Sequence, residues 1–122
     1  MKYLCLGYYD EGKFKDLPKA ELAELESKCR THDEALRKSG HLLSVASLAA
    51  PAESKCIRPK SAKPIVTDGP YAEAKEVIGA FFVIEAANLG EAVKVASLHP
   101  AAHLGEQVGW GVEVRPIDFW SE

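Results

Sequence analysis

The sequence predicts an α+β domain in which two strand-helix-strand units share one antiparallel sheet. Three observations support this fold class. An apolar and aromatic run opens the chain, a helical pattern of about six turns follows it, and the second half repeats that order. At 122 residues and 13.3 kDa the chain is long enough to bury one core of its own. We therefore expect a single domain over residues 1–122.

The first half contains the longest predicted helix. Lys2–Tyr8 is apolar and aromatic and is predicted as a buried strand that ends before a polar segment. In the helix that follows, Asp16 is expected as the N-cap, Pro18 lies in the first turn, and Gly40 stops it. His41–Ala49 is predicted as the next strand.

The second half repeats the pattern with shorter elements. Gly79–Ala86 is aromatic and β-branched and gives the strongest strand signal there. Asn88 is expected to cap a helix that Pro100 ends. The last predicted strand, "GWGVEVRPI", alternates apolar and charged residues.

Between the halves, "SKCIRP" and "KPIVT" are predicted to form a short hairpin joined through residues 60–62. Together the elements give a ferredoxin-like βαββαβ arrangement with an extra hairpin and with both helices on one sheet face. The apolar strands make exposure of the second face to water unfavourable, so we expect a homodimer that packs sheet against sheet.

Composition and charge narrow the class of protein. The net charge of −3 comes from 15 basic and 18 acidic residues without any basic block, which argues against a nucleic-acid partner. The apolar start is too short for a signal-peptide core or a membrane span, so we expect a cytoplasmic protein. Cys5, Cys29 and Cys56 lack CxxC spacing and fit free thiols.

Several segments together carry a family resemblance. They are His32 followed by Leu36 and Gly40, then "TDGPYAEAKE" from Thr67 to Glu76, then "GAFFVIEA", then "VEVRPI" from Val112 to Ile117. In this order they resemble the DGPF-type branch of the YciI-related (YCII) family over nearly the whole chain. The resemblance implies a dimeric α/β barrel built from two ferredoxin-like subunits.

The resemblance also implies two kinds of function. The wider family looks like small enzymes with a His/Asp pair, and one branch resembles dehydrochlorinases that act on chlorinated aromatics. The DGPF branch is associated with extracytoplasmic-function sigma factors, which implies a regulatory role instead. This chain departs from the pattern at Tyr71, where Phe is expected, at Ala80, where a second Gly is expected, and at His99, where the wider family has Asp before Pro.

His32 and Asp68 are the candidate catalytic pair. His32 continues the apolar stripe of the long helix, so its ring should face the sheet and act as a general base. The alternative is a core histidine bonded to a backbone carbonyl. Asp68 is expected to form an Asx-type turn in which Gly69 takes a positive φ and Pro70 fixes the exit. As a functional residue, Asp68 would orient His32.

The charged segment after this turn supplies candidate substrate-binding residues. Tyr71 adds a hydroxyl, Lys75 is expected to bind an anionic group, and Glu76 is expected to exchange protons. A solvated charged surface is the alternative for Lys75 and Glu76, and for Glu73 it is the preferred interpretation. Trp110 is expected at a dimer interface or, as the less favoured use, in a ligand cavity.

No cofactor or metal is expected. Cys29 and His32 share a helix face without a second pair of ligands, and Pro100 separates His99 from His103. There is also no phosphate-binding glycine loop and no nucleophile elbow.

Two hypotheses follow. The first is a cofactor-free dimeric enzyme that uses His32 and Asp68 for elimination or isomerisation of a small cyclic or aromatic substrate. The second is a non-catalytic dimer that binds a small ligand or a regulatory protein and is linked to sigma-factor signalling. A histidine and a carboxylate in contact inside a cavity would favour the first hypothesis.

Overall fold

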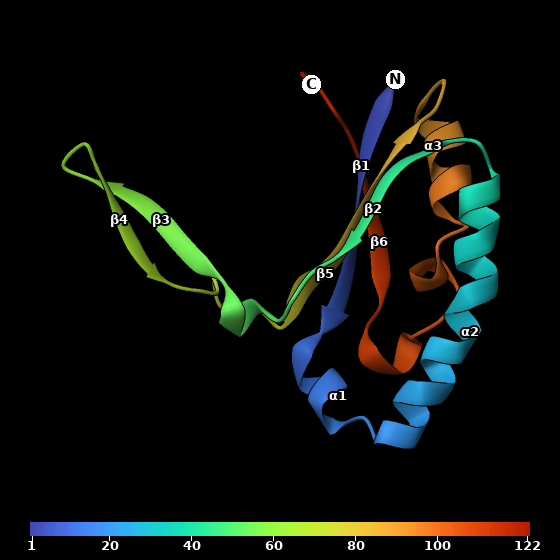
Figure 1. Cartoon of the computed structure of the whole chain (residues 1–122), viewed down its shortest axis with the longest axis horizontal. Coiled ribbons are helices and arrows are strands. Elements are labelled where there is room, and N and C mark those ends of the chain that lie inside the picture. Colours follow the sequence, from blue (N-terminus) through green and yellow to red (C-terminus); the bar gives the residue numbers. More distant parts are fainter.

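Four strands form one antiparallel sheet with β1 and β5 at its centre (Figure 1). The order across the sheet is β2-β5-β1-β6, and every neighbouring pair is antiparallel. The strands are β1 (Lys2–Asp10), β2 (Leu42–Ser47), β5 (Glu76–Glu85) and β6 (Gly111–Pro116). The computed structural model describes all 122 residues of the chain.

The two faces of β1 differ in their surroundings, because side chains alternate along a strand. Tyr3 and Cys5 are buried on the face that the helices cover. Leu4 and Leu6 point to the other face and are only half buried. We call this second face the open face of the sheet, and no helix covers it (Figure 1).

The long predicted helix is present as α2 (Lys19–Lys38), but its expected N-cap is wrong. Asp16 instead ends a separate short helix, α1 (Glu11–Asp16), and Pro18 stands at the N-cap of α2 without a side-chain hydrogen bond. The cause is Leu17, which precedes the proline and adopts an extended conformation with φ −73° and ψ 125°. Proline disfavours the helical conformation of the residue before it, so the chain breaks there.

The helices cover one face of the sheet, with α3 (Leu89–Ala96) beside α2 (Figure 1). The expected cap of α3 is confirmed, since Asn88 accepts a hydrogen bond from the backbone N–H of Glu91 at 2.9 Å. Three short 3-10 helices complete the connections: η1 (Pro51–Glu53), η2 (Pro100–Ala102) and η3 (Glu106–Val108).

The main core lies between this helical layer and the sheet. Nine buried residues form it: Tyr3, Cys5, Leu36, Phe82, Ile84, Ala86, Ala92, Val95 and Ala96. Burial raises the pKa of the Cys5 thiol to about 12, because the thiolate would lose its hydration. Cys5 is therefore an inert packing residue.

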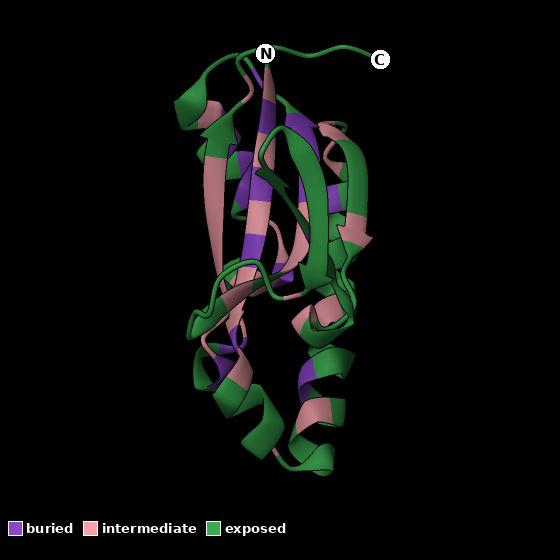
Figure 2. Cartoon of the chain, turned by 90° about the vertical axis from the view of Figure 1, so that its left-hand side faces the viewer, coloured by how far each residue is buried: buried purple, intermediate pink, exposed green.

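Strands β3 (Lys55–Lys60) and β4 (Lys63–Asp68) form a separate two-stranded hairpin. It projects from the sheet on the side away from the helices, and Figure 2 shows it in front of the open face. Its turn residues, Ser61 and Ala62, have φ values of 51° and 64°. Two positive φ angles define a type I′ turn, which suits a two-residue hairpin loop.

The structure is thus α+β with antiparallel sheets, and its strand order is compatible with a ferredoxin-like fold. No helix is long and apolar enough to cross a membrane.

Candidate functional site

A cleft of about 560 Å³ opens between α2 and the helix-covered face of the sheet. Its floor lies where β1 and β5 carry their smallest residues, Gly7, Gly79 and Ala80. Gly7 pairs with Ala80, and the register shifts next to them, which places Gly79 at a bulge in β5. Because glycine has no side chain and alanine has only a methyl group, space for a ligand remains here. Larger residues would fill this space between the sheet and α2.

The cleft has aromatic walls and a few polar groups. The aromatic residues of its lining are Tyr8, Tyr9, Phe14 and Trp110. Tyr9 and Phe14 pack edge to face with their ring centroids 5.5 Å apart. Gly105 lets the Trp110 ring pack closely, because a Cβ there would lie 2.2 Å from it. An apolar cavity with a few polar groups is the usual form of a small-molecule site.

One face of α2 supplies the acidic groups of the cleft. Glu26, Cys29 and Asp33 line it and lie at positions i, i+3 and i+7, which share a helix face. The pKa of the Cys29 thiol is raised by burial and, to a lesser degree, by the charges of Asp33 and Glu26. The thiol is therefore protonated and does not serve as a nucleophile.

His99 is the imidazole that lines this cleft. It precedes Pro100 and caps η2, where its Nδ1 accepts a hydrogen bond from the Ala101 backbone N–H at 3.0 Å. Its ring stacks on buried Phe82 with a centroid distance of 4.7 Å. Since Nδ1 is the acceptor, the neutral ring carries its proton on Nε2.

Burial lowers the pKa of His99 from its ordinary value of 6.5, and the nearby Asp33 carboxylate opposes this effect more weakly. The ring is therefore neutral at pH 7. The His99 Nε2 makes no hydrogen bond within the chain. Every buried side-chain polar atom does have a partner, so Nε2 is not buried and is accessible to a ligand. The cleft thus contains a fixed, neutral N–H donor near a carboxylate.

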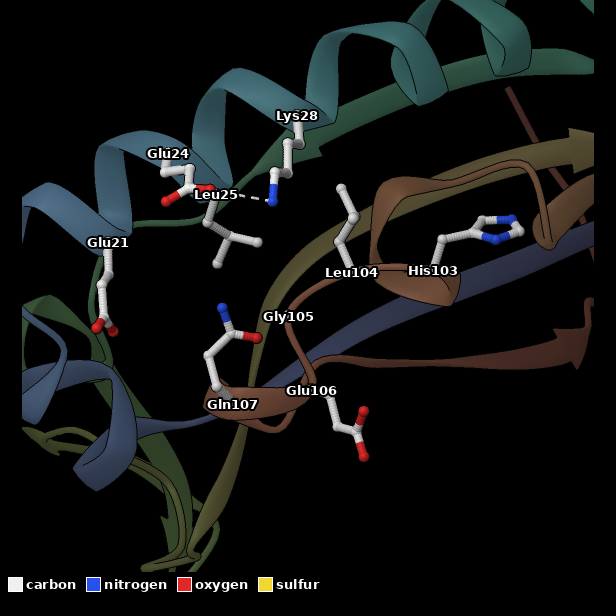
Figure 3. Close-up of a pocket in the computed structure, with 9 residues that line it drawn as sticks. All are labelled: Glu21, Glu24, Leu25, Lys28, His103, Leu104, Gly105, Glu106 and Gln107. Carbon is white, nitrogen blue, oxygen red and sulfur yellow. Dashed lines mark ion pairs between the residues drawn. The ribbon is translucent and has the colours of Figure 1, made fainter.

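A second, more polar groove of about 410 Å³ lies between α2 and the loop around η3 (Figure 3). Charged side chains surround this groove, and two of them, Lys28 and Glu24, form an ion pair at 3.2 Å. Its histidine, His103, uses Nε2 to donate a hydrogen bond to the Ser97 carbonyl. This groove is lined by only 2 hydrophobic residues, so it is the weaker candidate for an organic ligand.

The structure does not place His32 in the cleft. It is half buried on the stripe of α2 as expected, but its ring stacks on His103 at 4.8 Å and makes no hydrogen bond or ion pair. The stripe itself is confirmed by the burial of Leu25 and Leu36. His32 therefore packs against a neighbouring ring, and the carbonyl contact of the alternative interpretation is absent as well.

The structure does not bring Asp68 to His32 either. Asp68 ends β4 in the projecting hairpin, where its exposed carboxylate pairs with Lys55. The prediction that Gly69 takes a positive φ is also wrong. Glycine is needed there because a Cβ would lie 1.8 Å from the Ser54 hydroxyl, and the Gly69 N–H donates to the Ser54 carbonyl at 2.8 Å.

The three expected substrate-binding residues also lie outside the cleft. Tyr71 is exposed and stacks beneath Arg58, whose guanidinium carbon lies 4.0 Å from the ring centroid. Lys75 forms an ion pair with buried Asp10 at 3.8 Å. Glu76 is exposed at the start of β5. This segment stabilises the base of the hairpin and α1 within one chain.

No group of three or more His, Cys, Asp or Glu side chains is arranged to hold a metal ion. The pairs Cys29/His32 and His99/His103 therefore gain no third ligand from the fold.

Comparison with known proteins identifies the family of this chain. The family model described as "YCII-related domain" matches residues 1–120. The chain belongs to the YCII-related family. A relative from Rhizobium meliloti (strain 1021), "Uncharacterized protein R00369", is 32% identical over 124 residues, which cover 98% of this chain and 94% of the relative. Membership of the DGPF branch and the sigma-factor link stay predictions.

His99 is the residue that sequence reasoning missed. A signal was present, because a polar residue before Pro is typical of a helix start with Pro at N1. The family resemblance had led us to expect Asp, not His, before Pro100 at this position. Asp33, which follows His32 directly, gave no comparable signal.

Proposed function

We propose that this YCII-related protein binds a small cyclic or aromatic carbonyl compound in the cleft and isomerises it by proton transfer. The observation that carries the proposal is His99, a neutral imidazole that lines the cleft, has no partner for its Nε2 within the chain, and lies near the Asp33 carboxylate. A neutral histidine that donates a hydrogen bond can stabilise an oxygen as it gains negative charge.

The reaction needs only groups that the cleft contains. The Asp33 carboxylate removes a proton from the carbon next to the carbonyl, and the electron pair of that C–H bond moves to the carbonyl oxygen. The His99 Nε2–H donates a hydrogen bond to this oxygen. In a ligand with a C=C bond between the β and γ carbons, the proton then returns from Asp33 to the γ carbon as the carbonyl re-forms. The C=C bond moves to the α and β carbons, so no cofactor or second substrate takes part.

Deuterium exchange tests this proposal without knowledge of the product. A panel of cyclic and aromatic ketones is incubated with the protein in D₂O, and loss of the α-proton signal is followed by NMR. We expect catalysed exchange with at least one ketone, slowed by at least ~100-fold in Asp33→Asn and in His99→Asn. Asn at position 99 retains an oxygen that accepts the Ala101 N–H but removes the N–H at the Nε2 position.

His32→Asn is the matched control, because this histidine lies on the same helix as Asp33 but outside the cleft. It should leave the exchange rate within about two-fold of wild type. Ketones that bind without exchange would support the non-catalytic alternative. A panel that neither binds nor exchanges would contradict the proposal.

We also infer that the protein is a homodimer whose subunits pack through their open faces. The open face carries Leu4, Leu6 and Phe81 on its two central strands, paired across the strands as Leu6 with Phe81 and Leu4 with Val83. The hairpin on the same side exposes Ile57 and Val66 opposite each other, at 64% and 61%. A second copy would cover both apolar surfaces at once.

A further inference from the structure

The lining of the cleft has an unbalanced charge. Glu26 and Asp33 are its two carboxylates, and no lysine or arginine lines it. Of the other three carboxylates on the same helix, Glu24 pairs with Lys28 at 3.2 Å and Glu34 pairs with Arg30 at 3.6 Å. The third, Glu21, is unpaired and lies outside the cleft. Neither Glu26 nor Asp33 forms an ion pair. The cleft therefore presents two uncompensated negative charges to any ligand that enters it.

The two carboxylates lie about two helical turns apart along the lining of the cleft. They are seven residues apart on α2, which separates them by about 10 Å along the helix axis. Asp33 lies near His99, whose pKa its charge affects. Glu26 lies toward the N-terminal half of α2, the half beside α1 (Figure 1). Only Asp33 is therefore placed to act with His99, and the proposed reaction does not use Glu26.

The α1 end of the cleft is also its aromatic end. Tyr9 precedes α1 and Phe14 belongs to it, and both rings line the cleft. Ring faces attract cations, and a carboxylate in the same lining, such as Glu26, can add a direct ion pair. An anionic ligand would meet two carboxylates with no counter-charge, so its binding would be opposed.

We propose that the ligand of this cleft carries a cationic amine, which Glu26 and the aromatic rings of Tyr9 and Phe14 bind while its carbonyl end meets His99 and Asp33. This inference rests on the proposed function, because it names the substrate class of the same cleft. The chemical class is a small aromatic or cyclic amine with a carbonyl group about 10 Å or less from the nitrogen.

Three probes that differ in charge test the inference. They are 2-phenylethylamine, 2-phenylethanol and phenylacetate, which share a phenyl ring on a short chain and are respectively cationic, neutral and anionic at pH 7. Binding is measured by protein-observed NMR titration, with Gly7, Gly79 and Ala101 as backbone reporters of the cleft. We expect the amine to bind at least ten-fold more tightly than the alcohol, and phenylacetate to bind more weakly than both.

Glu26→Gln should remove most of the preference for the amine while the alcohol still binds. Glu24→Gln is the matched control, since this carboxylate lies on the same helix but is paired with Lys28 and lies outside the cleft. It should leave the preference unchanged. Alcohol or phenylacetate binding as tightly as the amine would overturn the charge inference and leave the cleft as a binding site. If all three probes fail to perturb the cleft reporters, both the inference and the proposed binding function are overturned.

Discussion

At the scale of single residues, the state of His99 depends on contacts from three parts of the chain. The Ala101 N–H comes from η2, Phe82 comes from β5, and the Asp33 charge comes from α2. Sequence can identify a polar residue before Pro100 as a helix start. It cannot show which cavity the ring faces, because that depends on how these three elements pack. For the same reason His32 was correctly predicted on the apolar stripe but did not lie in the cleft.

Gly79 gives a prediction at this scale. A Cβ at this position would lie 2.7 Å from the Tyr9 ring, so Gly79→Ala must displace that ring from the cleft wall. We expect a loss of about 1–3 kcal/mol in the free energy of unfolding. Binding of 2-phenylethylamine should weaken as well. Chemical denaturation and NMR titration measure the two effects.

Gly111→Ala is the control for this substitution. Gly111 begins β6, and a Cβ there would have no atom within 4 Å. Its free energy of unfolding should stay within about 0.5 kcal/mol of wild type. Equal destabilisation by the two alanines would show that Gly79 does not maintain the cleft.

At the scale of elements, the helices show what local patterns can and cannot determine. The stripe of α2 and the Asn88 cap of α3 were predicted because both are local features. The short helix α1 was not, since its six residues include a glycine and show no apolar stripe. The extended conformation of Leu17 separates α1 from α2. The sequence had predicted instead that Asp16 caps the long helix.

The hairpin turn between β3 and β4 has unusual residues for its type. Ser61 and Ala62 adopt positive φ angles that favour Asn and Gly, and residues with a Cβ are strained there. Ala62→Gly should therefore stabilise the hairpin by about 1 kcal/mol, which corresponds to about five-fold slower hydrogen exchange of the β3 and β4 amides. Gly40→Ala makes the opposite change at a glycine that also has a positive φ. A Cβ added at Gly40 would meet no atom within 4 Å, so only backbone strain is introduced, and this variant should destabilise the protein. Faster exchange in Ala62→Gly would contradict the strained-turn account.

At the scale of the whole molecule, the fold class was predictable because apolar periodicity, helix stops and strand order agree along the chain. The sheet order β2-β5-β1-β6 is the one that two strand-helix-strand units with a shared sheet require. The direction of the hairpin was not predictable from its own residues. That direction keeps Asp68, at the end of β4, away from His32 on α2 (Figure 1).

The inferred homodimer leads to a prediction about the open face. Leu6→Arg places a charge in the centre of that face, and we expect it to convert a dimer into a monomer of 13.3 kDa. Light scattering after size exclusion measures the mass, and circular dichroism confirms that the variant is folded. Val93→Arg on α3 is the control, because Val93 is already 48% exposed and belongs to the helical layer. A wild-type protein that is monomeric at high concentration would contradict the inference.

The central claim is that the cleft contains a neutral His99 that offers its Nε2–H to a ligand. Side-chain ¹⁵N NMR of His99 across a pH titration tests this claim most directly. We expect the Nε2–H tautomer at pH 7 and a midpoint below the ordinary 6.5, because burial disfavours the charged ring more than Asp33 favours it. The folded protein should accordingly lose stability as the pH falls below 6.5, where the unfolded chain binds this proton more readily. An Nδ1–H tautomer, or a midpoint at or above 6.5, would contradict the account.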